Sequence, residues 1–109
     1  MKVFEGIGAS DGIAEGPAHW VRSAEDLEQF EPGAVLVAQM TSPDWGSAYQ
    51  NAAAVVTMEG GMLCHAAIVA REEGIPAVVG LGSDLGLVKD GVRVRVDGSA
   101  GLVILAATD

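Results

Sequence analysis

Short apolar runs recur along the chain, separated by turn residues. Residues 34–38 are apolar at every position, so both side-chain parities are hydrophobic. A strand with this pattern is covered on both faces. A second buried strand is expected over residues 52–57 and a third over residues 75–80. The pattern therefore predicts buried strands through the middle of the chain.

The C-terminal part of the chain alternates instead. Residues 92–96 read Val-Arg-Val-Arg-Val, the period-two pattern of a strand with valines inward and arginines outward. Asp97-Gly98 follows as a turn, and residues 102–105 supply a last apolar strand. We expect this part of the chain to form a hairpin.

Start and stop signals place the helices. Residues 23–30 are expected to form a short acidic helix with Ser23 as its N-cap. Thr41-Ser42-Pro43-Asp44 combines a capping hydroxyl, a first-turn proline and an acid, which predicts a helix through about Asn51. A helix over residues 64–73 ends at Gly74. We expect two of these to be the main helices of the fold.

The first part of the chain contains several glycines, at positions 6, 8, 12 and 16. They predict a looping N-terminal segment, followed by a strand over residues 18–21. No internal repeat, low-complexity tract or linker is visible in the sequence. Residues 1–109 are therefore expected to form one domain.

Composition excludes several classes of function. The chain has 109 residues, 15 acidic and 6 basic, and a net charge of -9, which repels a phosphate backbone and argues against nucleic acid as a partner. The single cysteine, Cys64, has no disulfide partner, and its spacing from His19 and His65 is not that of a zinc site. We expect no bound metal and a reducing, cytoplasmic environment. No apolar run approaches the ~20 residues of a membrane span and no signal peptide is visible, so we expect no membrane role.

Residues 59–72 combine features suited to phosphate chemistry. Gly60-Gly61 follow a buried strand and let the chain turn sharply, and His65 then lies at a helix start. The first N–H groups of a helix are unpaired and its dipole is positive there, which favours an anion and a neutral imidazole. A neutral imidazole has a lone pair that can attack phosphorus. A covalent role for His65 is one hypothesis for this segment.

Other interpretations of the segment stay open. A single histidine at the start of an apolar helix is commonly structural. Cys64 is a second candidate nucleophile, for an independent hydrolase that uses Cys64 and His65, because helix starts favour thiolates. Adjacent helical residues point ~100° apart, however, and no Asp or Asn is placed by the sequence to complete a Cys-His pair. We expect Cys64 to be a buried, inert thiol.

A longer stretch carries a family resemblance. Residues 60–80, Gly-Gly-Met-Leu-Cys-His-Ala-Ala-Ile-Val-Ala-Arg-Glu-Glu-Gly-Ile-Pro-Ala-Val-Val-Gly, resemble the phosphohistidine signature of the mobile, swivelling domain in phosphoenolpyruvate-utilising enzymes. That family includes phosphoenolpyruvate synthase, pyruvate phosphate dikinase, the first enzyme of the sugar phosphotransferase system and rifampicin phosphotransferase. Residues 6–16, 41–45 and 90–101 resemble the same domain. The resemblance implies the α/β class, as a three-layer β/β/α sandwich.

The resemblance also implies a phosphoryl carrier. In the family, the histidine that matches His65 takes a phosphoryl group at one site and delivers it at another. Gly60, Gly61, Leu63 and Cys64 would then form the phosphate-binding loop and helix start. A nucleotide-binding domain or a barrel for phosphoenolpyruvate or pyruvate does not fit in 109 residues. We therefore expect ATP with Mg²⁺, or phosphoenolpyruvate, on partner domains of the same enzyme or on separate chains, and no cofactor on this chain alone. The sequence does not distinguish these donors, nor does it identify the acceptor.

The chain departs from the family pattern at several positions. Leu63 stands where the family usually has a threonine, Met58 where an aspartate is frequent, and Asp11 where a proline is usual. The missing hydroxyl and carboxylate keep an alternative function open, a catalytically silent regulatory or binding module that retains the fold. Arg71, which the family shares, lies ~9 Å along the helix and ~240° around it from His65, so we assign it to structure.

Overall fold

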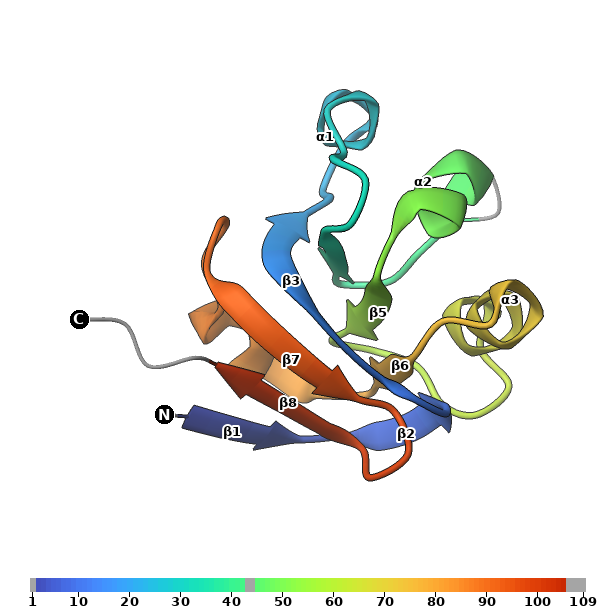
Figure 1. Cartoon of the computed structure of the whole chain (residues 1–109), viewed down its shortest axis with the longest axis vertical. Helices are drawn as coiled ribbons and strands as arrows, with labels where there is room; N and C mark the ends of the chain where they lie inside the picture. The colour runs from blue at the N-terminus through green and yellow to red at the C-terminus, as the bar shows by residue number, and fades with distance from the viewer. Residues whose placement is uncertain (1, 43–44, 106–109) are drawn as a thin grey trace.

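Eight strands form the frame of the molecule, in the order β1-β8-β7-β3-β4-β5-β6-β2 (Figure 1). The structure is a computed structural model and describes residues 2–42 and 45–105. The strands are β1 (Lys2–Glu5), β2 (Ile7–Ser10), β3 (Ile13–Trp20), β4 (Val35–Ala38), β5 (Ala54–Thr57), β6 (Ala77–Val79), β7 (Arg93–Asp97) and β8 (Leu102–Leu105).

Strand β3 belongs to two layers. Its first part pairs antiparallel with β7, and its last residues pair parallel with β4. On the β7 side the layer continues antiparallel through β8 to β1. On the β4 side it continues parallel through β5 to β6, and β2 adds to it antiparallel. The two edge strands β1 and β2 are consecutive in the chain and meet at Gly6, whose N–H donates to the Gly101 carbonyl at 2.9 Å.

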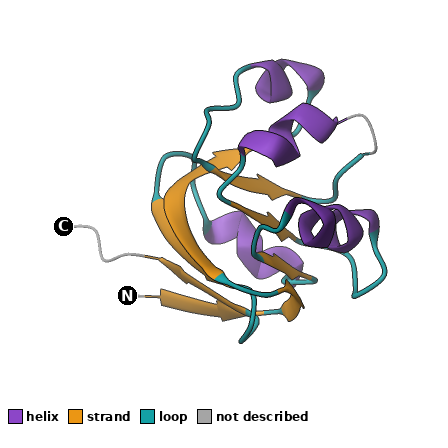
Figure 2. Cartoon of the chain, turned by 45° about the vertical axis from the view of Figure 1, so that its right-hand side comes forward, coloured by secondary structure: helices purple, strands orange, loops and turns teal. Residues whose placement is uncertain are grey.

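Helices α2 and α3 make the third layer (Figure 1). The α-helices are α1 (Ala24–Glu28), α2 (Gly46–Asn51) and α3 (His65–Glu73), and η2 (Gly82–Leu87) is a 3-10 helix. In Figures 1 and 2, α2 and α3 lie on the side of β4, β5 and β6 that faces away from β7 and β8. The predicted three-layer β/β/α sandwich is confirmed.

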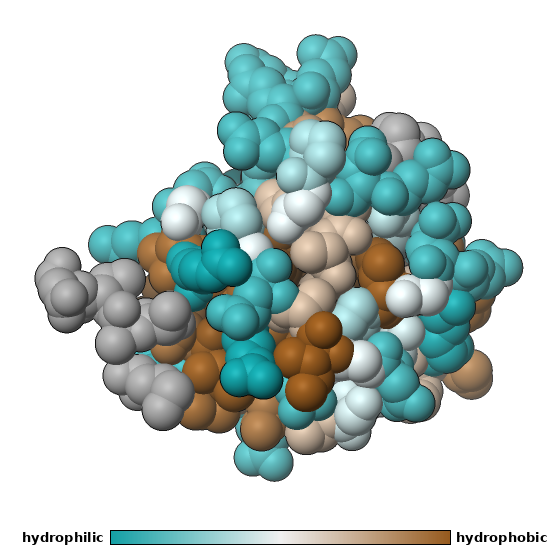
Figure 3. All heavy atoms as spheres, viewed as in Figure 1, coloured by the Kyte–Doolittle hydropathy of each residue, from teal (hydrophilic) through white to brown (hydrophobic). Residues whose placement is uncertain are grey.

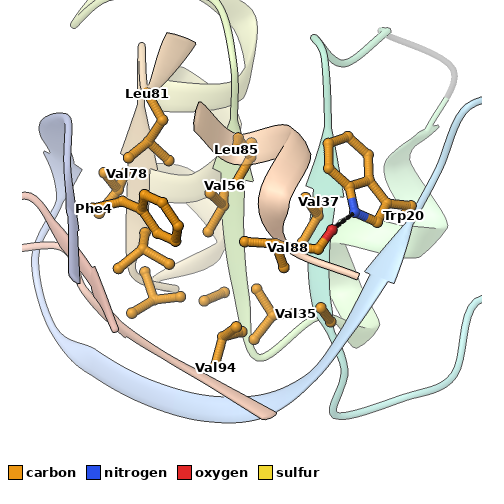
Figure 4. Packing of buried hydrophobic residues seen from close by; sticks show 14 residues of the cluster. Phe4, Trp20, Val35, Val37, Val56, Val78, Leu81, Leu85, Val88 and Val94 are labelled. Carbon is orange, nitrogen blue, oxygen red and sulfur yellow. Dashed lines mark hydrogen bonds between the residues drawn. The ribbon is translucent and has the colours of Figure 1, made fainter. Parts of the chain in front are cut away.

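Two apolar clusters fill the spaces between the layers. The cluster between the two sheets includes Phe4, Trp20, Val56 and Leu85 (Figure 4). Within it the Trp20 indole N–H donates to the Val88 carbonyl at 2.6 Å, so the one polar atom of that ring is satisfied. The second cluster lies between the parallel strands and the helices, and small alanines of α3 let the helix approach the sheet closely. Strands β4 and β5 contribute to both clusters, which is why they are apolar at every position.

Most of the predicted elements are present. The alternation over residues 92–96 corresponds to β7, whose valines are buried and whose arginines are exposed, and β7 and β8 form the predicted hairpin. Ser23 caps α1 by accepting a hydrogen bond from the Asp26 N–H. Gly74 ends α3 with a φ of 72°, the left-handed conformation that a helix C-terminus favours in glycine.

Two expectations about the elements are wrong. The N-terminal segment is not a loop, because β1, β2 and the start of β3 occupy it, with their glycines packed against other backbone. Helix α2 begins at Gly46 with Trp45 as its N-cap and no side-chain cap, while Pro43 and Asp44 of the predicted start lie outside the described residues. The three predicted helices are all present as α1, α2 and α3, and the described part of the chain also holds η2, which was not predicted.

The surface is hydrophilic over α1, which has no buried residue and projects at the top of Figure 3. Within residues 2–42 and 45–105, no helix has both the length and the apolar character needed to cross a membrane.

Candidate functional site

The site lies where parallel strands end next to the start of α3. Thr41 follows β4, and the loop from Met58 to Cys64 joins β5 to α3. In open α/β sheets, ligands bind outside the carboxyl ends of parallel strands, because adjacent loops diverge there. A small hollow of about 50 Å³ occupies this position, lined by Met40, Thr41, Thr57, Glu59, Gly60, Cys64, His65 and Ala66.

The glycine loop is held by hydrogen bonds at its start. The buried Thr57 hydroxyl donates to the Glu59 carbonyl at 2.6 Å, and the Glu59 N–H donates to the Gln39 carbonyl at 3.0 Å. Gly60 then adopts a φ of 121°, and a Cβ there would lie 2.7 Å from the Cys64 sulfur. A glycine is required at this position for both reasons. The loop therefore turns back toward the start of α3.

Helix α3 begins with free backbone donors. Its N-cap, Cys64, is extended and makes no side-chain hydrogen bond to the helix. The N–H groups of His65, Ala66 and Ala67 in the first turn therefore have no intrahelical acceptor. Their dipoles and those of the helix behind them favour negative charge at this end.

The His65 imidazole is half-buried and makes a directed contact to a hydroxyl. Its Nδ1 lies 3.5 Å from Thr41 Oγ1, at the long end of the hydrogen-bond range. The Tyr49 hydroxyl donates to the same Thr41 oxygen. The Tyr49 ring meets the imidazole edge-on, with centroids 6.1 Å apart and an interplanar angle of 76°. Because Nδ1 is engaged by Thr41, Nε2 is the nitrogen left for a ligand.

Burial raises the pKa of Tyr49 to about 12, against the hydrogen bond to Thr41, which lowers it; the nearby Cys64 adds a smaller raising effect. Ionising the phenol would place a negative charge among apolar side chains, because Tyr49 is 1% exposed. Tyr49 is therefore a protonated donor throughout the physiological pH range.

Tyr49 is the one tyrosine of the chain, so its ionisation can be read directly by ultraviolet absorbance. We expect a phenolate midpoint of about 12 in the folded protein, against about 10 in the denatured chain. Because the folded pKa is the higher one, the stability that this proton contributes is complete below about pH 10 and is lost as pH rises through about 12. Tyr49→Phe lacks this loss and serves as the control. A midpoint near 10 in the folded protein contradicts the prediction.

Arg71 holds the loop from outside the hollow. Its guanidinium donates to the Ala9 carbonyl of β2 at 2.8 Å and to the Met62 carbonyl at 2.9 Å. Both bonds go to backbone, so the side chain ties the segment before α3 to the N-terminal strands. The structure agrees with the assignment of Arg71 to structure.

The structure brings some of the predicted site residues together. Gly60, Cys64 and His65 line the hollow, and the Gly61 carbonyl accepts the Cys64 N–H at 3.1 Å. Leu63 is 85% exposed and does not line it. Cys64 is half-buried, so the expectation of a fully buried thiol is wrong: as N-cap it lies at the rim of the hollow.

Thr41 and Tyr49 are the residues that sequence reasoning missed. Thr41 was considered only as a helix cap, yet its hydroxyl contacts Tyr49 and His65. A signal was present, because Thr41 follows one buried strand closely and the glycine loop follows the next. The ends of adjacent parallel strands meet at one edge of a sheet. Nothing in the sequence pattern distinguishes the Tyr49 hydroxyl from that of any other helical tyrosine.

Comparisons with known proteins identify the family of the chain. Residues 30–101 match the sequence model of the family described as "PEP-utilising enzyme, mobile domain". The chain is 49% identical over 102 residues to the "Uncharacterized phosphotransferase YvkC" of Bacillus subtilis (strain 168), covering 94% of this chain and 12% of the relative. It is 50% identical over 101 residues to a "Probable phosphoenolpyruvate synthase" of Archaeoglobus fulgidus, covering 93% and 13%. The chain thus spans about an eighth of the length of these relatives.

A solved structure shows the same arrangement of elements. The solution structure titled "NMR solution structure of Enzyme I (nEIt) protein using two 4D-spectra" superimposes with a TM-score of 0.63 at 36% identity. The match covers 76% of this chain and 34% of that chain.

Proposed function

Because the chain belongs to the family of PEP-utilising enzyme mobile domains, we propose that it is a phosphoryl carrier and that His65 is the residue that holds the phosphoryl group. The observation that carries this proposal is the position of the imidazole. His65 is the first residue of α3, at the helix end where backbone amides have no intrahelical acceptor, and its Nδ1 faces Thr41, which leaves Nε2 for the phosphoryl group.

The transfer step follows from this arrangement. In the tautomer with the proton on Nδ1, Nδ1–H donates to Thr41 Oγ1 and Nε2 holds the lone pair. That lone pair attacks phosphorus, an N–P bond forms, and the bond from phosphorus to the donor's oxygen breaks, with the electron pair leaving on that oxygen. In the second half-reaction an acceptor oxygen attacks phosphorus and the N–P bond breaks. The ring thus returns to its starting state.

The protein supplies little positive charge for this step. The guanidinium of Arg71 is bound to two carbonyls, and the chain carries a net charge of -9. The free amides at the start of α3 offset part of the phosphoryl charge. We propose that the remaining charge is met by other domains, which bind ATP with Mg²⁺ or phosphoenolpyruvate. The relatives, roughly eight times longer than this chain, have room for such domains.

A small-molecule donor tests the proposal without knowledge of these domains. The folded chain is incubated with phosphoramidate, which transfers phosphoryl groups to accessible imidazole nitrogens. We expect a mass increase of one phosphoryl group that is lost in acid and kept in alkali, as an N–P bond requires. A folded chain that takes up no phosphate, or takes up only acid-stable phosphate, contradicts the carrier function and favours the catalytically silent binding module.

A further inference from the structure

We propose that Tyr49 is a positioning residue for His65: by donating its hydroxyl proton to Thr41 Oγ1, it holds that oxygen in register with Nδ1 of the imidazole. The inference rests on the proposed function of His65 as phosphoryl acceptor. It assigns a role to a buried side chain of α2 that does not line the hollow.

Burial alone does not account for the Tyr49 hydroxyl. The ring is 1% exposed and packs in the cluster between the sheet and the helices, a place that phenylalanine fills equally well. A hydroxyl in such a place is costly unless it is bonded. Here it is bonded to Thr41 Oγ1, the same atom that contacts His65. Tyr49, Thr41 and His65 thus form a chain of three polar groups from the core to the hollow.

The inventory of donors and acceptors explains what Tyr49 adds. A threonine hydroxyl has one proton and two lone pairs. Tyr49 takes one of the lone pairs, and as a protonated phenol it only donates there. One proton and one lone pair remain for His65. By turning its O–H bond, Thr41 can accept from Nδ1–H or donate to a bare Nδ1 while its oxygen stays in place.

This property matches what a carrier histidine needs. The imidazole gains and loses a phosphoryl substituent during each cycle, so its inner partner must hold the ring in both states. An oxygen held by Tyr49 keeps the ring oriented in both states. Without the phenol hydroxyl, Thr41 loses the partner that fixes its rotamer. The imidazole of His65 is then no longer held in one orientation by Thr41.

The test is a double-substitution cycle on the full chain. Tyr49→Phe removes only the hydroxyl and keeps the ring packing, and Thr41→Val removes the link at its other end. We expect each single variant to slow phosphate uptake from phosphoramidate by about three- to tenfold, the effect of one neutral hydrogen bond. We expect the double variant to be no slower than Thr41→Val, because both changes break one chain. Thr41→Ser, which keeps the hydroxyl, restores most of the rate.

A second measurement needs no phosphoryl donor. The ¹⁵N shifts of both imidazole nitrogens are recorded at mildly alkaline pH, where a free imidazole is neutral. In Tyr49→Phe we expect those of His65 to move toward the average of freely exchanging tautomers. Those of His19, which packs against Phe30 on another part of the surface, stay unchanged.

The outcomes are decisive in both directions. Unchanged His65 shifts in Tyr49→Phe overturn the positioning role. So does a double variant whose rate loss equals the product of the losses in Tyr49→Phe and Thr41→Val, because the two changes then act independently. A wild-type chain that takes up no phosphate overturns the proposed function of His65 instead, and the ¹⁵N shifts still decide whether Tyr49 orients the ring.

Discussion

We expect replacement of His65 by asparagine to abolish phosphate uptake. Asparagine keeps a polar amide of comparable reach but has no nucleophilic lone pair on nitrogen, because that pair is delocalised into the carbonyl. The hollow, the glycine loop and the free amides of α3 remain, so the loss isolates the covalent role. It is measured as the acid-labile mass increase in the wild-type chain and its absence in His65→Asn.

His19→Asn is the matched control for this loss. His19 is the other histidine of the chain, and it lies on β3 with its ring 5.0 Å from that of Phe30, outside the hollow. We expect His19→Asn to take up phosphate as the wild type does. Cys64→Ser is expected to retain uptake as well, which separates the imidazole from its half-buried neighbour at the helix start. Phosphate uptake that persists in His65→Asn, or is lost in Cys64→Ser, contradicts the assignment of the phosphoryl group to His65.

The second large effect is on stability, at Gly98. This residue follows β7 in the turn of the hairpin, and a Cβ added to it would lie 1.8 Å from the Ser10 carbonyl oxygen and 3.0 Å from the Ala77 nitrogen. Both neighbours are backbone and cannot give way as a flexible side chain would. We expect Gly98→Ala to lower the free energy of unfolding by about 3 kcal/mol or more, because relief requires the two sheets to separate there.

Gly86→Ala is the control, because it makes the same glycine-to-alanine change at a site with free space. Gly86 has no positive φ, and an added Cβ would meet nothing within 4 Å. Its effect is expected to stay within about 1 kcal/mol and to be neutral or favourable, since alanine reduces the entropy of the unfolded chain. Denaturant unfolding followed by tryptophan fluorescence measures both variants. Equal midpoints for Gly98→Ala and Gly86→Ala would mean that the close approach is not needed for folding.

The elements that could be predicted are those whose signal is local. The residues of β4 and β5 are apolar on both faces because each strand separates two clusters, and this requirement is visible at every position. The start and end of α3 were predictable from the glycines and His65, since a helix boundary depends on a few neighbouring residues. The position of His65 at the hollow followed from the same boundary.

The features that were missed depend on contacts between distant segments. The N-terminal glycines indicated turns, yet Gly8 lies in strand β2. It is a glycine because the neighbouring Gly98 carbonyl leaves no room for a side chain. The pattern cannot distinguish a glycine that bends the chain from one that admits another strand. The link from Tyr49 through Thr41 to His65 likewise joins an α2 side chain to a loop residue and to the first residue of α3, and only the packing of α2 against α3 reveals it.

The ladder between β1 and β8 also bears on how the domain can move. Lys2 pairs with Leu105, so the first and last described residues lie side by side on one rung of the ladder, at the left of Figure 1, with α3 on the right. In any longer polypeptide that continues from both ends, the connecting segments would act as paired tethers at a single corner. Such segments would act on β1 and β8, on the opposite side of the molecule from α3, which begins with His65 (Figure 1).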